Sequence, residues 1–158
     1  MRWITRERPK IDRVACPWLI HRFIDPIAEF LFVPPAEVER QAAEYDAIPF
    51  DVEGAELSHE GPRCSFDAFL VKYSLTDPAL QTIATIVRGA DTAQLGLAPQ
   101  SAGLLAISLG LSRLFADDAE MLRHGFVVYD ALYAWCREAS TETHDWNPQR
   151  HQPRSGAP

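Results

Sequence analysis

The sequence predicts a helix-rich α+β or α/β fold, in which a few short strands pack against five or six helices. Apolar residues recur at helical spacing through most of the 158-residue chain, whereas strand-like apolar runs are short and few. The composition, 47% hydrophobic and 23% charged, is typical of one globular domain with its own core. We expect this domain to span residues 1–147. Residues 148–158 lack apolar anchors and are expected to form a mobile tail.

The first half of the chain supplies the strands. Residues 3–5 form a short candidate strand. Residues 29–33, EFLFV, predict a buried strand, because an apolar run ends there at two prolines. Residues 36–45 predict a helix with an acidic exposed side. Residues 47–52 predict a strand that Pro49 restricts to a sheet edge.

A further helix is predicted between the first two strands. Proline suits the first helical turn and disrupts the interior, so Pro17 predicts the helix start and Cys16 its N-cap. At 100° per residue, one side of this helix would be apolar. The opposite side would carry Trp18, His21, Arg22 and Asp25 and line a cleft or an interface.

The second half of the chain is predicted to be helical throughout. Ser65 would cap one helix, and Asp77-Pro78 predicts the N-cap and first residue of the next, which Gly89 would end. Residues 101–115 are apolar nearly all round, which predicts a central buried helix. A last long helix would begin at Asp117 or Asp118.

Charge and composition exclude several classes of partner. A net charge of −7 and a pI near 5.2 disfavour direct DNA binding and binding to anionic membranes. The longest apolar run, residues 102–111, is too short to span a bilayer, and residues 1–10 do not form a signal peptide. Three cysteines suggest free thiols in a reducing compartment, so we expect a cytoplasmic protein.

Cys16 is the candidate catalytic residue. A thiol at a helix N-terminus lies at the positive end of the helix dipole, which favours the nucleophilic thiolate. Arg13 and Arg22 flank it and would form an anion site. The alternative is that Cys16 is a small buried residue and that the arginines form ion pairs.

A second cluster carries the chemistry of a metal site. His59 and Cys64 precede a predicted helix, and Asp91 follows Arg88 at the end of the next one. Imidazole, thiolate and carboxylate are ligands of zinc and iron, so these three residues are candidate ligands of a divalent metal. Alternatively, His59 is a surface residue and Asp91 caps a turn. Three further residues could join the site: Asp12, Asp67 and His144.

Several separated segments, in order, resemble the C-terminal domain of the chromate resistance protein ChrB family. The segments are KIDRVACPWLIHRFIDP, PFDVEG, SHEGPRCSFD, IVRGADT, GLLAISLGLSR and YDALYAWCR. The resemblance covers roughly residues 2–147, which would therefore be a ChrB C-terminal-like domain. It implies a bacterial cytoplasmic protein of the chromate stress response, encoded near chromate transporters.

The resemblance also bears on partners. Longer family members are described as chromate-responsive regulators with an additional N-terminal domain, which this chain lacks, so DNA binding is not expected here. Related domains fused to rhodanese-like sulfurtransferase modules suggest a rhodanese-like or regulatory partner and thiol chemistry.

Three functions remain open from the sequence. The favoured one is a sensor or accessory domain that binds a metal ion or a chromate- or sulfate-like oxyanion, with Arg13, Arg22 and Arg88 supplying charge. The second is a metal-dependent enzyme with thiol or redox chemistry at Cys16. The third is a non-catalytic interaction domain of a larger complex. Neither the oligomeric state nor the metal follows from the sequence.

Overall fold

A three-stranded parallel sheet forms one side of the molecule. The computed structural model describes residues 1–144, and in them the strands are β1 (Arg2–Arg6), β2 (Glu29–Val33) and β3 (Ile48–Pro49). Their order is β2-β1-β3, with Trp3 of β1 in register with Phe30 and with Ile48. The third strand is an edge strand, as Pro49 predicts, but it is shorter than the predicted 47–52. The predicted tail, residues 148–158, lies outside the described residues.

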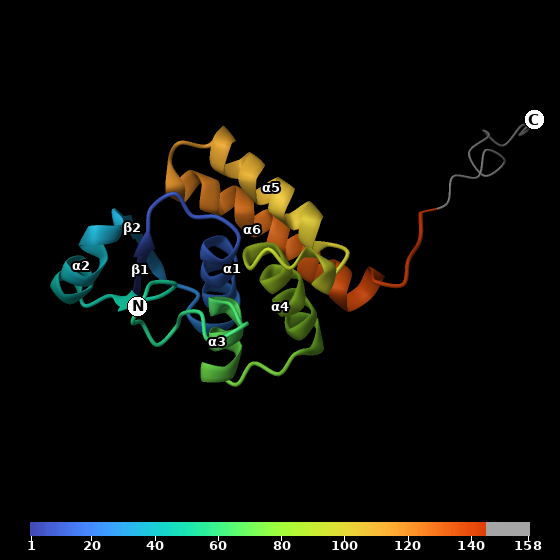
Figure 1. The fold of residues 1–158 in the computed structure, drawn as a ribbon, viewed down its shortest axis with the longest axis horizontal. Coiled ribbons are helices and arrows are strands. Elements are labelled where there is room, and N and C mark those ends of the chain that lie inside the picture. Colours follow the sequence, from blue (N-terminus) through green and yellow to red (C-terminus); the bar gives the residue numbers. More distant parts are fainter. Residues whose placement is uncertain (145–158) are drawn as a thin grey trace, which may run out of the picture.

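Within residues 1–144, six α-helices pack around the sheet and beyond it, which confirms the helix-rich α+β prediction. They are α1 (Asp12–Leu19), α2 (Val38–Tyr45), α3 (Ser65–Lys72), α4 (Pro78–Asp91), α5 (Ser101–Leu114) and α6 (Asp118–Ala134). Short 3₁₀ segments lie at Pro35–Glu37 and Leu95–Leu97, and π-helical turns extend α1 over Ile20–Ile24 and α6 over Trp135–Ala139. Figure 1 shows α2 on one side of the sheet and α1 between the sheet and the α4–α6 layer. No helix in residues 1–144 is both long and apolar enough to cross a bilayer.

Helix α1, and not the 101–115 segment, is the central buried helix. It begins at Asp12, so the prediction that Pro17 starts it and that Cys16 is its N-cap is wrong. Pro17 lies inside the helix, where the burial of α1 on all sides outweighs the lost backbone hydrogen bond. For the same reason Trp18, predicted on a polar face, is fully buried.

Helix α5 lies on the surface, contrary to its predicted central position (Figure 1). Its inward side carries Leu104 and three serines, and its outward side exposes Ile107 and Leu114 among other apolar residues. One of these serines, Ser101, packs closely on α4. Ser101 donates its hydroxyl hydrogen to the carbonyl of Ile86 at 3.0 Å. The outward side of this helix is apolar although it is exposed, so the apolar sequence does not mean that the helix is enclosed.

Helix α4 begins as predicted and ends later. The side chain of Asp77 accepts a hydrogen bond from the amide of Ala79 at 2.8 Å, which confirms the N-cap. The helix passes through Gly89 and ends at Asp91, so Gly89 is not its stop. A Cβ atom at Gly89 would lie 2.3 Å from Oγ of Ser101, so the glycine provides space for α5.

The two faces of the sheet carry different cores, and this fixes where a site can form. Trp3 belongs to the main core with α1 and α3, whereas Ile4 packs with Val33 and Val38 on the α2 side. The β1–β2 connection thus covers one face and leads to one side of β1, whereas the β2–β3 connection covers the other face and crosses β1 to its other side. In such sheets a crevice opens at the carboxyl ends of the two strands where the direction reverses, here β1 and β3.

Candidate metal centre

Three side chains from distant parts of the sequence converge at this crevice. Asp12, His59 and Asp91 each offer a ligand atom, and these atoms lie within 4.8 Å of one another. Nε2 of His59 is 3.2 Å from Oδ2 of Asp91 and 3.5 Å from Oδ2 of Asp12. Ligands bound at about 2.1 Å in octahedral or tetrahedral geometry lie about 3.0–3.4 Å apart. The two distances from His59 are close to this range, and the ligand atoms of Asp12 and Asp91 lie within 4.8 Å of each other.

Asp12 is held in place by the first turn of α3. Its carboxylate accepts hydrogen bonds from the backbone amides of Ser65 at 2.6 Å and Phe66 at 3.1 Å. It also accepts the thiol hydrogen of Cys16 at 3.3 Å. The amides at the start of a helix favour a negative charge, so they fix the orientation of the carboxylate. Asp12 thus joins the start of α1 to the start of α3.

Asp51, which the sequence analysis did not single out, is a further carboxylate at the site. Its Oδ1 lies 3.3 Å from Nε2 of His59 and accepts the hydroxyl hydrogen of Ser65 at 2.9 Å. Its Oδ2 is 3.0 Å from Arg6 and 3.3 Å from Arg13. One sequence signal could have found it, because Asp51 lies near the carboxyl end of the strand predicted over residues 47–52, and the carboxyl ends of parallel strands share an edge.

The cluster concentrates negative charge around one imidazole. Contact with Asp12, together with the charges of Asp51 and Asp91, raises the pKa of His59 to about 9 against the opposing effect of burial. Burial and the charge of Asp12 raise the pKa of Asp51. Burial, followed by the charges of Asp12 and Asp51, raises the pKa of Asp91 to about 6. The proton on His59, together with Arg6 and Arg13 at Asp51, offsets the charge of these carboxylates.

The backbone on either side of the site is held in an unfavourable conformation. Ile11, just before Asp12, has φ 41°, and Asp51 has φ 49°. Positive φ is rare for a β-branched residue. The carbonyl of Ile11 accepts hydrogen bonds from the amide of Ala15 at 2.8 Å and from the hydroxyl of buried Tyr129 at 3.0 Å. These contacts fix the turn that presents Asp12.

The predicted cysteines lie beside the cluster and not within it. Cys16 is fully buried in α1, and burial together with the charge of Asp12 raises the pKa of its thiol well above the ordinary value. Cys64 is the N-cap of α3, the position predicted for Ser65. Its Sγ lies 3.6 Å from Oδ2 of Asp67, and burial raises the pKa of this thiol as well. Neither environment favours a thiolate.

The predicted arginines are distributed over three places. Arg13 lies at the cluster through Asp51. Arg88 donates to Oδ1 of Asp67 at 2.8 Å, in the first turn of α3. Arg22 is paired with Asp130 of α6 through contacts of 2.9 and 2.7 Å, so it lies on a different surface. Each has a carboxylate partner.

The remaining candidate ligands also lie outside the group of three. Asp67 accepts the backbone amide hydrogen of Cys64 at 3.1 Å, so it caps α3. His144 is exposed beyond the last helical turn. Among the residues that the structure describes, the sequence candidates that converge on one point are His59, Asp91 and Asp12.

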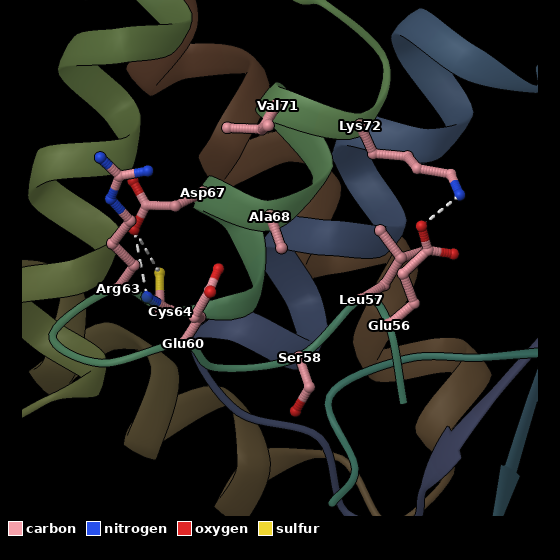
Figure 2. Close-up of a pocket in the computed structure, with 10 residues that line it drawn as sticks. All are labelled: Glu56, Leu57, Ser58, Glu60, Arg63, Cys64, Asp67, Ala68, Val71 and Lys72. Carbon is pink, nitrogen blue, oxygen red and sulfur yellow. Dashed lines mark hydrogen bonds and ion pairs between the residues drawn. The ribbon is translucent and has the colours of Figure 1, made fainter. Parts of the chain in front are cut away.

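Two hollows adjoin these residues. A cleft of about 1030 Å³ is bordered by α2 and the 51–59 loop, and Asp51 and His59 lie in its wall. A smaller pocket of about 300 Å³ lies beside α3, where Figure 2 shows Cys64 and Asp67 at one end and the Glu56–Lys72 ion pair at the other. The larger cleft is the one that reaches the carboxylate cluster.

Comparison with known proteins identifies the family. A curated relative, Protein ChrB of Cupriavidus metallidurans, is 39% identical over 133 residues. The match covers 83% of this chain but 39% of the relative, so the chain spans well under half of the length of that protein. No solved structure matches the chain. The family model for the C-terminal domain of ChrB matches residues 3–136, and the chain therefore belongs to the ChrB C-terminal domain family.

Proposed function

We propose that this domain binds one divalent metal ion through Asp12, His59 and Asp91 and acts as a sensor or accessory protein in chromate resistance. The observation that carries the proposal is the convergence of these three ligand atoms within 4.8 Å. Membership in the ChrB family supports the association with chromate resistance. We place the protein in the bacterial cytoplasm, with a rhodanese-like or regulatory protein as its partner.

The ligand set favours zinc, iron(II) or a similar ion. One imidazole and two carboxylates are ligands of borderline to hard character. Asp51 lies 3.3 Å from the same imidazole nitrogen, so it can act as a fourth ligand or orient the first three. Three protein ligands leave a coordination position for water or a substrate. At that position the ion would supply Lewis-acid chemistry.

An oxyanion site is less well supported by the same residues. Carboxylates repel chromate and sulfate, and three aspartates face His59. Arg13, Arg22 and Arg88 already have carboxylate partners. The α3 amides that could bind an anion are occupied by Asp12. A bound metal would reverse this balance by adding two positive charges.

Metal analysis of protein purified without a histidine tag tests the proposal. We expect close to one zinc or iron per chain, and its loss in Asp91→Asn and His59→Ala. Asp46→Asn is the matched control, because Asp46 is exposed at the end of α2 and has φ 50°, which asparagine also tolerates. The proposal would be contradicted if the protein took up no metal when incubated with zinc, iron(II) or manganese. Equal metal content in all variants would also contradict it.

A metal-dependent enzyme is the second candidate. The 1030 Å³ cleft that includes His59 and Asp51 in its wall favours it, because a sensor of a bare ion needs no such space. Cys16 would then be an adjacent thiol, although its burial opposes direct contact with a substrate.

A further inference from the structure

The cleft beside the cluster has a composition suited to an organic ligand. Its wall combines apolar groups on α2 with others on the following loop. The apolar residues that line it include Val38, Ala42, Pro49, Val52 and Ala55. Its volume, about 1030 Å³, is at the upper end of the range of about 300–1000 Å³ for pockets that hold drug-sized molecules. A tetrahedral inorganic anion would fill only a small part of it.

Arg6 contributes a positive charge to the lining of this cleft. It ends β1, and its Nη2 donates to the carbonyl and carboxylate of Asp51 at 2.9 and 3.0 Å. Its Nε is buried with no acceptor, and within residues 1–144 only Nη2 has protein partners. The side chain is 41% exposed, so the guanidinium keeps a donor edge for a ligand.

Two carboxylates in the lining of the cleft have the opposite charge. Glu39 and Glu53 line the cleft and have no ion-pair partner among the described residues. They would repel the anionic group of a ligand, whereas Arg6 and the metal would attract it. The charges in the lining therefore favour Arg6 and the metal as the position of an anionic group.

We infer that the cleft binds a small organic carboxylate, with its carboxylate at Arg6 and the metal and its apolar part along Ala42 and Val52. This inference rests on the proposed metal site and names the class of ligand that would reach the open coordination position. It favours the enzyme or metabolite-sensor form of the function over a protein that senses an inorganic ion alone.

The test is a series of unbranched carboxylates from acetate to octanoate, titrated calorimetrically into zinc-loaded protein. We expect the affinity to rise about fourfold for each added methylene until the cleft is filled. Octanol should bind much more weakly than octanoate. Arg6→Gln should weaken every carboxylate by a similar factor and leave the dependence on chain length unchanged.

Variants of α2 and of the loop separate the cleft from non-specific binding. Ala42→Trp should abolish the dependence on chain length while the metal content stays the same. Ala55→Trp blocks the opposite wall and serves if the α2 variant does not fold. Ala43→Trp is the matched control, because Ala43 is exposed on the same helix and does not line the cleft.

The outcomes distinguish the two proposals. Protein that contains metal but shows no dependence on chain length, or an equal dependence in Ala42→Trp, would overturn the cleft assignment and leave the metal site standing. Protein that binds no metal would overturn both. Cobalt-substituted protein provides a second readout, since octanoate at the open position should change the visible spectrum of the bound ion.

Discussion

The carboxylate of Asp12 accepts the backbone amide hydrogen of Ser65 at 2.6 Å, so the first residue of α1 meets the first residue of α3. This contact has two roles in one group. The carboxylate satisfies amides that the start of α3 would otherwise leave unpaired, and its Oδ2 lies 3.5 Å from Nε2 of His59. Stability and the proposed metal binding would therefore depend on the same side chain.

Asp12→Ala should lower the stability of the metal-free protein. The amides of Ser65 and Phe66 and the thiol of Cys16 would lose their shared acceptor, at a cost of about 1–3 kcal/mol. Urea denaturation monitored by circular dichroism measures the change. An unfolding midpoint equal to that of the parent protein would show that these hydrogen bonds add nothing to the free energy of unfolding.

Asp91→Asn should have the opposite effect on the metal-free protein. Burial and neighbouring aspartates raise the pKa of Asp91 to about 6, so ionising it at pH 7 costs folding free energy. That cost is absent below the ordinary pKa near 3.8 and is fully present above pH 6. Asparagine does not ionise, so we expect a gain of about 1–3 kcal/mol at pH 7. The same substitution should weaken metal binding at least 100-fold, as measured by competition with a chelator. A variant that is both less stable and unchanged in affinity would contradict the assignment.

Metal binding should depend strongly on pH through His59. The pKa of His59 in the metal-free fold is about 9, so the ion must displace a proton at neutral pH. Affinity should rise by up to about tenfold per pH unit between pH 6.5 and 9 and level off above that. The protonated form also stabilises the metal-free fold. This contribution is complete below the unfolded pKa near 6.5 and is lost as the pH rises through 9.

Calorimetry across this pH range tests the dependence, and His59→Gln should remove the corresponding slope from the thermal stability of the metal-free protein. An affinity that is flat between pH 6.5 and 9 would exclude His59 as a ligand.

The cysteines should differ in their rate of alkylation. Cys16 and Cys64 are fully buried, and burial raises the pKa of each, whereas Cys136 is partly exposed. Iodoacetamide at pH 8, followed by peptide mass spectrometry, should label Cys136 in the folded protein and all three in urea. Rapid labelling of Cys16 in the native state would show that its thiol is accessible and reactive.

Two glycines should respond in opposite directions to alanine. A Cβ atom at Gly103 of α5 meets nothing within 4 Å, so Gly103→Ala should stabilise the helix by about 0.5–1 kcal/mol. A Cβ atom at Gly89 would lie 2.3 Å from Oγ of Ser101, so Gly89→Ala should destabilise by about 1–3 kcal/mol. Differential scanning calorimetry gives both values. Equal effects would mean that α4 and α5 do not pack as closely as described.

The sequence predicts most elements where local rules decide them. The Asp77-Pro78 helix start and the position of the strand at residues 29–33 are correct, because capping chemistry and flanking prolines act over a few residues. The strand is not buried as predicted, because it lies at an edge of the sheet, and within it only Val33 is buried. Two predictions are wrong because tertiary packing decides them: the helix start at Pro17 and the central position of the 101–115 helix. Burial on every side keeps Pro17 inside a helix, and small inward serines place an apolar helix on the surface.

The candidate site was partly predictable for similar reasons. His59 and Asp91 attract attention because of their chemistry, and they do converge. The thiol of Cys64 was assigned to the same set from its position before a helix, but its side chain lies by Asp67. Asp51 and Arg6 meet at the site because β1 and β3 are neighbouring strands. To predict this contact, one would need the strand order β2-β1-β3.

The positive φ of Ile11 has a consequence for the residue before Asp12. Glycine would adopt the same backbone angles freely, and the strain that isoleucine accepts is about 1–3 kcal/mol. The side chain of Ile11 is 7% exposed in the main core, and its burial returns about 1.5–3 kcal/mol. These values nearly cancel, so isoleucine at this position adds little net free energy of unfolding over glycine. What isoleucine does provide is a stiffer turn, which holds the carboxylate of Asp12 in one orientation.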